Sequence, residues 1–306
     1  MNNYVALTVG VICAGIGGEL FLRGVVGIAH WARVAPGIIG ATVAAFATSS
    51  PELSVAVGSA LAKKPEISLG DALGSNVINV ALILAIPVII SGIKTAPESV
   101  KREYPVALFA PMLTAALALD GVISRIDGVI LLCVFMVWLT SVTLEVRRQR
   151  SAAEKVLGEQ RGWLALILCI AGLLFLIGAG HFIVTGAKGI AMAFGIHAFV
   201  IGAIVVAVGT SVPELATTIM AKIRGHDEVG LGTILGSNIF NGLFIIAVAA
   251  IIYPIKIVLN ETMTVLVFGL ISMMLVFPLR DGVIRRWRGL LLLGLYVAYV
   301  LMVLDK

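Results

Sequence analysis

Charged residues are scarce in this chain of 306 residues. Asp, Glu, Lys and Arg make up 13% of it, against roughly 25% in soluble domains. Hydrophobic residues make up 60%, and the mean hydropathy is +1.09. Because so few charges cannot cover a soluble surface, the composition excludes a soluble globular protein and predicts a polytopic membrane protein.

Cysteine and histidine are also rare, and the motifs of processed or catalytic proteins are missing. The three cysteines, Cys13, Cys133 and Cys169, lie singly in apolar segments, so we expect buried side chains and neither a disulfide nor a zinc site. No basic residue precedes the first apolar run and no small-residue cleavage signature accompanies it, so we expect the first helix to be retained. No nucleophile, metal-ligand or phosphate-binding motif is present. An enzyme is therefore the least favoured class, and no cofactor is expected.

Basic residues lie mainly in the short loops between apolar stretches. A spanning helix needs roughly 20 apolar residues, and cutting the chain at its charged and Pro/Gly clusters leaves ten candidates. With the N-terminus outside, sixteen of the 22 Lys and Arg residues fall on the cytoplasmic side and six on the other, which is the bias of cytoplasmic loops. This topology explains the net charge of +5 better than a nucleic-acid partner does. It predicts a multi-pass protein of the cell membrane, surrounded by lipid, with both termini outside. The predicted spans are residues 4–28, 36–62, 67–92, 104–119, 126–146, 163–187, 198–221, 229–253, 262–279 and 287–303.

Two stretches of the chain occur twice. GATVAAFATSSPEL, at 40–53, returns as GAIVVAVGTSVPEL at 202–215, with nine of fourteen positions identical. GDALGSNVIN, at 70–79, returns as GTILGSNIFN at 232–241, with the same offset of 162 residues (202 − 40). Four segments in one register indicate an internal duplication of the chain.

The duplication divides the chain into two halves of five spans each. The predicted halves are residues 1–146 and 163–306, joined by a short basic cytoplasmic linker at 147–162. Because five is odd, the second half enters the membrane from the opposite side, as in the inverted repeats of secondary transporters. The expected fold class is an all-α integral membrane protein of ten transmembrane helices in two inverted five-helix repeats.

Each copy of the first motif carries a carboxylate in an otherwise uncharged apolar run, which is costly in a bilayer. A Thr and a Ser lie four and three residues before it, on the same helix face. The proline directly before it lacks an N–H, so a carbonyl of the preceding turn, near Ala47 in the first copy, loses its helical partner. Such oxygen ligands suit Ca²⁺ or Na⁺ and argue against zinc or copper. The residues are Thr48, Ser49, Pro51 and Glu52, and Thr210, Ser211, Pro213 and Glu214.

Each copy of the second motif adds a hydroxyl and an amide four residues apart, Ser75 with Asn79 and Ser237 with Asn241. Ca²⁺ takes about six to eight oxygens, which two carboxylates, threonine carbonyls and water can supply. For a single copy, packing is the ordinary alternative, with a protonated glutamate and Ser, Thr and Gly as helix contacts. The duplication of both motifs favours an ion site. Four acidic residues near predicted helix ends are instead expected to cap helices, namely Asp71, Asp120, Asp127 and Asp281.

The doubled patterns G-x-x-x-x-A-x-x-T-S-x-P-E and G-x-x-x-G-S-N-x-x-N resemble the α-repeats of the prokaryotic-type sodium/calcium exchanger family, in the cation/calcium antiporter superfamily. The resemblance covers essentially the whole chain. It implies ten helices, of which the second, third, seventh and eighth form the ion site and the first and sixth slide across them. It further implies Ca²⁺ ligands at Glu52, Glu214 and the main-chain oxygens of Thr48 and Thr210. The implied Na⁺ ligands are the hydroxyls of Ser49, Ser75, Ser211 and Ser237 and the carbonyls of Ala45 and Ala207.

The predicted function is electrogenic, Na⁺-driven export of Ca²⁺ by alternating access. Proton-coupled Ca²⁺ exchange through the same glutamates is the nearest alternative, although the Thr-Ser pair before the proline resembles the sodium branch. A cation channel with a two-glutamate filter is a further alternative, which inverted repeats disfavour. Asn241 stands where many sodium/calcium exchangers have Asp. The short linker lacks the large Ca²⁺-sensing region of animal members, so no such regulation and no obligatory protein partner is expected.

Overall fold

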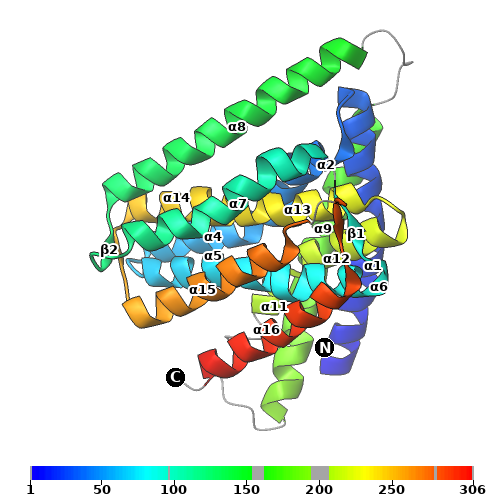
Figure 1. The fold of residues 1–306 in the computed structure, drawn as a ribbon. Coiled ribbons are helices and arrows are strands. Elements are labelled where there is room, and N and C mark those ends of the chain that lie inside the picture. The colour runs from blue at the N-terminus through cyan, green and yellow to red at the C-terminus, as the bar shows by residue number, and fades with distance from the viewer. Residues whose placement is uncertain (1, 96, 154–161, 194–206, 279–280, 305–306) are drawn as a thin grey trace.

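A computed structural model of the chain describes residues 2–95, 97–153, 162–193, 207–278 and 281–304. Nearly all of these residues are helical (Figure 1). Seven helices are long and apolar enough to span a membrane, and an eighth span is added if the bent pair Pro36–Thr48 and Ser50–Leu61 is counted as one. The prediction of a helical, multi-pass membrane protein is therefore confirmed.

The first half begins with the long helix α1, which starts at an Asn2 side chain that accepts from Tyr4 N. It ends where Arg33 adopts a left-handed conformation, φ 58°, and closes the last turn onto His30 and Ala29. The elements of this half are α1 (Asn3–Ala32), α2 (Pro36–Ile39), the π-helical stretch η1 (Gly40–Ala44), α3 (Ala45–Thr48), α4 (Ser50–Leu61), α5 (Pro65–Ile78), the π-helical stretch η2 (Asn79–Leu84), α6 (Ala85–Ser91), β1 (Ile93–Lys94), α7 (Pro97–Leu117), β2 (Val122–Ile123) and α8 (Arg125–Ala153).

The second half repeats this order over the residues that the structure describes. Its elements are α9 (Gly162–Ala193), α11 (Ala207–Thr210), α12 (Val212–Ile223), α13 (Asp227–Ile239), the π-helical stretch η4 (Phe240–Ile245), α14 (Ile246–Ile252), β3 (Ile255–Lys256), α15 (Leu259–Val276), β4 (Val283–Ile284) and α16 (Arg286–Leu304).

Two helices of the first half, α7 and α8, extend furthest beyond their predicted bounds. α7 begins at Pro97, seven residues before the predicted span at 104–119, because proline suits a first helical turn and the buried Glu103 is paired with Arg102. α8 continues into the predicted linker as far as Ala153. Its last turns are stabilised by Glu145, which accepts from Arg148 and Gln149 at 3.1 and 3.0 Å.

The number of spans stays a prediction. Neither α7 nor the pair α11 and α12 is among the candidate spans of the described residues. The predicted span at 198–221 begins outside the described residues, and residues 154–161 of the predicted linker at 147–162 also lie outside them.

Two short antiparallel ladders, which the all-α expectation did not include, join loops of one half to loops of the other. β1 pairs with β4 and β2 pairs with β3. Each ladder is extended by one backbone bond, Thr95 N to Gly282 O at 2.9 Å and Ile257 N to Gly121 O at 2.8 Å. β1 and β2 lie at opposite ends of the bundle (Figure 1). Strands of two residues have no periodicity that a sequence could reveal, so the ladders were missed.

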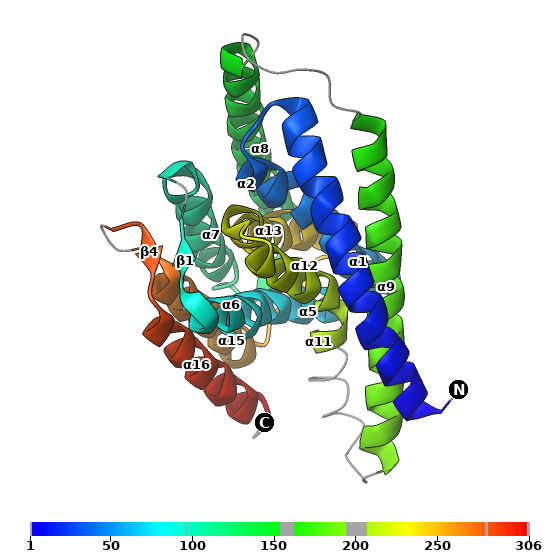
Figure 2. The same cartoon turned by 90° about the vertical axis from the view of Figure 1, so that its right-hand side faces the viewer.

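The helices α5 and α13, with their extensions α6 and α14, are the most buried spans and form the centre of the bundle. The pair α1 and α9 lies side by side along one flank (Figure 2). Glycines line the seam between them, because a Cβ at Gly24 or Gly172 would collide with the backbone of the facing helix. Cys169 is buried in this seam, as predicted, whereas Cys133 is exposed and Cys13 is half-buried; none is in a disulfide.

Candidate ion-binding site

The repeated Thr-Ser-x-Pro-Glu segments break their helices in the same way. Ser49 separates α3 from α4 with φ −88° and ψ 12°, and Ser211 separates α11 from α12 with φ −87° and ψ 9°. In the first half the axis bends by 45° at this point. The prolines lie in the first turn of the second segment, where a missing N–H costs nothing. The break places each following glutamate at the start of a helix, in the interior of the bundle.

Glu52 and Glu214 are both buried, each with 1% of its surface exposed. They are close enough to repel each other electrostatically. In each, Oε2 has no hydrogen-bond partner, and within the described residues neither glutamate forms an ion pair with Lys, Arg or His. Two buried carboxylates without counter-charges are unfavourable unless cations or protons neutralise them.

Two serine hydroxyls bind one of these carboxylates. Oε1 of Glu214 accepts from Ser49 Oγ at 3.2 Å and from Ser237 Oγ at 3.5 Å. The hydroxyls at the other two predicted positions, Ser75 and Ser211, are buried and have no partner. The structure thus brings Glu214 together with serines of both halves, and it leaves two further hydroxyls available as neutral ligands.

The predicted amides are also buried. Asn79 begins η2 and Asn241 lies at the start of η4. Oδ1 of Asn79 has no partner, and neither end of the Asn241 amide has one. Unpartnered amide oxygens at this depth are suited to bind a cation or an ordered water.

Some of the main-chain carbonyls of the first repeated motif already accept hydrogen bonds within the protein. The Ala45 carbonyl already accepts from Ser49 N at 3.0 Å and from the Thr48 hydroxyl at 3.3 Å. The Ala47 carbonyl has no helical partner because Pro51 lacks an N–H, as expected, but it accepts from Ser50 Oγ at 2.7 Å and is therefore not spare. Thr48, Thr210 and Ala207 lie on the broken segments as expected, and the part of their main-chain oxygens in ion binding stays a prediction.

Asp71 belongs to the neighbourhood of the site, and its predicted role as a helix cap is wrong. It lies in the interior of α5, one turn before Ser75, and acts electrostatically on Glu52. Its Oδ2 has no partner. The spacing Asp71, Ser75, Asn79 was the signal that could have revealed it. Of the other three predicted caps, only Asp127 acts at a helix start, where it accepts from Ser124 N just before α8. Asp120 and Asp281 accept instead from the first amides of strands β2 and β4, Val122 N and Val283 N.

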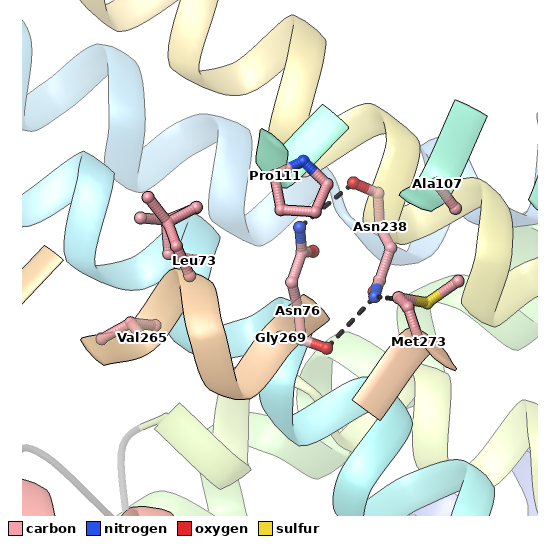
Figure 3. Close-up of a pocket in the computed structure, with 9 residues that line it drawn as sticks. Leu73, Asn76, Ala107, Pro111, Asn238, Val265, Gly269 and Met273 are labelled. Carbon is pink, nitrogen blue, oxygen red and sulfur yellow. Dashed lines mark hydrogen bonds between the residues drawn. The ribbon is translucent and has the colours of Figure 1, made fainter. Parts of the chain in front are cut away.

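The sequence interpretation also missed a pair of asparagines that lies between the two central helices, α5 and α13. Asn76 of α5 and Asn238 of α13 each donate Nδ2 to the backbone carbonyl of the other, both at 3.1 Å (Figure 3). A cavity of about 20 Å³ beside them, also lined by Leu73 and Met273, has room for roughly one water. These asparagines tie the halves together next to the predicted ligands.

The predicted ligand side chains of the two repeated motifs are two carboxylates together with neutral hydroxyl and amide oxygens. Within the described residues, no three His, Cys, Asp or Glu side chains come together as a metal centre. Oxygen ligands with two negative charges suit hard cations such as Ca²⁺ and Na⁺.

Comparison with known proteins agrees with the resemblance seen in the sequence. A family model described as sodium/calcium exchanger protein matches residues 2–144 and 164–304. The sodium/calcium exchanger MaX1 of Methanosarcina acetivorans is 26% identical over 97% of each chain. The putative antiporter CaxA of Alkalimonas amylolytica is 30% identical over 258 residues, 82% of this chain and 81% of that one.

The fold is likewise shared with solved structures. The sodium-calcium exchanger NCX_Mj, soaked with 10 mM Na⁺ and zero Ca²⁺, superposes with a TM-score of 0.82 at 30% identity, over 97% of each chain. Both the sequence match and the structural match extend over nearly the whole chain. The chain therefore belongs to the sodium/calcium exchanger protein family.

Proposed function

We propose that this protein is a Na⁺/Ca²⁺ antiporter, which exports Ca²⁺ across the cell membrane by alternating access and is driven by the Na⁺ gradient. The observation that carries the proposal is the pair of buried carboxylates, Glu52 and Glu214, whose Oε2 atoms have no partner. Their two negative charges balance one Ca²⁺. The same charges can be shared by several Na⁺ ions that take their remaining ligands from neutral oxygens.

The neutral oxygens favour Na⁺ over protons as the coupling ion. Ser75, Ser211 and Asn241 bury hydroxyl and amide groups that have no partner among the residues that the structure describes. Proton exchange needs only the carboxylates, so these groups would be a cost without a purpose in a proton antiporter. If more Na⁺ charge than Ca²⁺ charge crosses in each cycle, transport is electrogenic and responds to membrane potential.

Matched contacts between the halves support an inverted repeat. Arg125 Nε donates to Ile251 O at 3.1 Å, and Arg286 Nε donates to Ile89 O at 2.7 Å. Each arginine thus binds the end of the third span of the other half, as a two-fold relation between the halves requires. With ten spans divided at 147–162, this relation and the positive charge of the loops assigned to the cytoplasm support a topology with both termini outside and the linker in the cytoplasm.

Cysteine labelling tests that topology. Lys64 and Arg148 are both exposed, and single cysteines at these positions in a background without the three native cysteines should label from opposite sides. Position 64 should react from outside, and position 148 only after permeabilisation. Labelling of both positions from one side would contradict the inverted repeat.

The function is tested by measuring Ca²⁺ uptake into proteoliposomes under separately imposed Na⁺, H⁺ and voltage gradients. We expect an outward Na⁺ gradient to drive uptake and an imposed potential to change its rate. If a pH gradient drives uptake in sodium-free vesicles as fast as a Na⁺ gradient does, the protein is a proton-coupled exchanger. Flux far above carrier rates, without coupling to either ion, would indicate a channel.

A further inference from the structure

The side-chain oxygens of the two central asparagines are used differently, although each Nδ2 donates to the backbone carbonyl of the other asparagine. Oδ1 of Asn238 accepts from Nδ2 of Asn79 at 3.1 Å. Oδ1 of Asn76, the equivalent atom of the first half, has no partner. Asn238 therefore makes one contact with a predicted ligand that Asn76 does not make.

That contact decides which end of the Asn79 amide is free. A carboxamide has a donor end and an acceptor end of nearly the same shape, and a half-turn about its last bond exchanges them. Because Nδ2 of Asn79 is bound to Asn238, its Oδ1 is the end without a partner. Asn79 begins η2, one helical turn after Ser75 of α5, so the free oxygen belongs to the face that carries the serine hydroxyl.

We propose that Asn238 is a positioning residue that holds the Asn79 amide with its oxygen toward the transported cations. The inference rests on the proposed function, since it assigns Asn79 to the ion site. Without the acceptor at 238, the amide would be free to present its N–H₂ end, whose positive hydrogens repel a cation. Asn238 thus acts on ion binding through Asn79, without being a ligand itself.

The repeat supplies a matched control within the same protein. Asn76 makes the same bond between α5 and α13 that Asn238 makes, at the same 3.1 Å. Its Oδ1 holds no amide, and the equivalent of Asn79, Asn241, has neither end partnered. A substitution at 76 therefore removes one tie between the helices, whereas the same substitution at 238 removes one tie, a long contact of 3.9 Å to Met273 Sδ and the orientation of Asn79.

The test measures cation binding by the thermal stability of the purified, full-length protein in detergent, titrated with Na⁺ and separately with Ca²⁺. Asn238→Leu should raise the concentration for half-maximal stabilisation about tenfold, the effect of losing roughly 1.4 kcal/mol of binding free energy. Asn76→Leu should raise it less than about twofold. In an Asn79→Asp background, adding Asn238→Leu should have less than about a twofold effect, because a carboxylate presents an oxygen in either orientation.

Two results would overturn the inference. Equal shifts in the two leucine variants would mean that the tie between the helices explains the effect. An undiminished shift in the Asn79→Asp background would mean that Asn238 does not act through Asn79. If Asn238→Leu does not fold, Asn238→Ser, which is too short to reach Asn79, replaces it, with Asn76→Ser as the control. A wild-type protein that Ca²⁺ stabilises and Na⁺ does not would contradict Na⁺ coupling, and the same comparison made with Ca²⁺ would still decide the role of Asn238.

Discussion

The two halves carry the same ligand residues but use them differently. In the second half, Glu214 binds two serine hydroxyls, one from each half. The corresponding hydroxyls for Glu52 are those of Ser211 and Ser75, which have no partner. Among the amides the relation is reversed, because Asn79 of the first half is held and Asn241 of the second is not. A duplicated sequence therefore does not impose a symmetric conformation. Each of these hydrogen bonds that a residue of one half lacks is made by the equivalent residue of the other half.

The halves also differ in how their first helices are attached to the rest of the bundle. Glu19 of α1 accepts from Arg224, at the end of α12, at 2.6 and 2.9 Å, and from Arg23 at 2.7 Å. The equivalent positions, 162 residues away, are His181 and Ala62, which cannot form this pair. Because the equivalent positions cannot form this cluster, we expect it to stabilise one orientation of the proposed alternating-access cycle more than the other.

The largest effect is expected where the halves are most alike. Glu52→Gln and Glu214→Gln should each reduce coupled Ca²⁺ flux more than about 100-fold, because one remaining carboxylate cannot balance a divalent ion in a site of low dielectric. The measurement is Na⁺-driven Ca²⁺ uptake by protein that purifies normally, with Glu66→Gln, at the exposed start of α5, as the control. Near-normal exchange by either variant would remove both residues from the site.

Serine substitutions test whether the difference in hydrogen bonding between Glu214 and Glu52 is limited to one conformation of the protein. Ser49→Ala with Ser237→Ala removes the hydroxyls that bind Glu214, and Ser75→Ala with Ser211→Ala removes the two that have no partner. We expect each double variant to raise the half-saturating Na⁺ concentration of transport about tenfold, with less effect on Ca²⁺, which depends mainly on the carboxylates. An effect confined to one pair would show that the halves stay unequal throughout the cycle.

Asp71 has no acidic counterpart, since Thr233 stands at the equivalent position and donates to Val229 O at 2.9 Å. Asp71→Asn should lower the apparent Ca²⁺ affinity about fivefold, because it removes a negative charge that acts on Glu52. Thr233→Val, which has nearly the same shape, should leave Ca²⁺ affinity unchanged. The apparent Ca²⁺ affinity of both variants is measured from the concentration dependence of Ca²⁺ uptake. An unchanged affinity in Asp71→Asn would show that the charge of Asp71 does not influence the ion site.

The smallest effect is expected from the ion-pair cluster of Glu19. Exposed ion pairs are worth about 0–1 kcal/mol, so Arg224→Ala should change the ratio of the two orientations no more than about fivefold. The reactivity of a single cysteine on one face, followed with and without Ca²⁺, reports this ratio. Ala62→Ser is the control at the equivalent position. A ratio that does not change would mean that the cluster is equally stable in both orientations.

Much of the fold could be predicted because a bilayer imposes length, apolarity and loop charge on its helices. The candidate site could be predicted because Glu52 and Glu214 stand out in apolar runs. Asp71 was missed because its position in the sequence, soon after Pro65, resembles that of a cap. Asn238 was missed because its role depends on a contact with Asn79 from the other half, which no local pattern contains.

The ladders β1–β4 and β2–β3 have a mechanical consequence. They fasten the two halves to each other at both ends of the bundle, so the halves form a closed frame that cannot hinge open at one end without breaking backbone hydrogen bonds. α1 and α9 carry no strand and lie on one flank of this frame (Figure 2). We therefore expect the cations to remain at a fixed depth in the membrane during transport. Movement driven by the Na⁺ gradient should be confined to α1 and α9, and the frame should keep its shape.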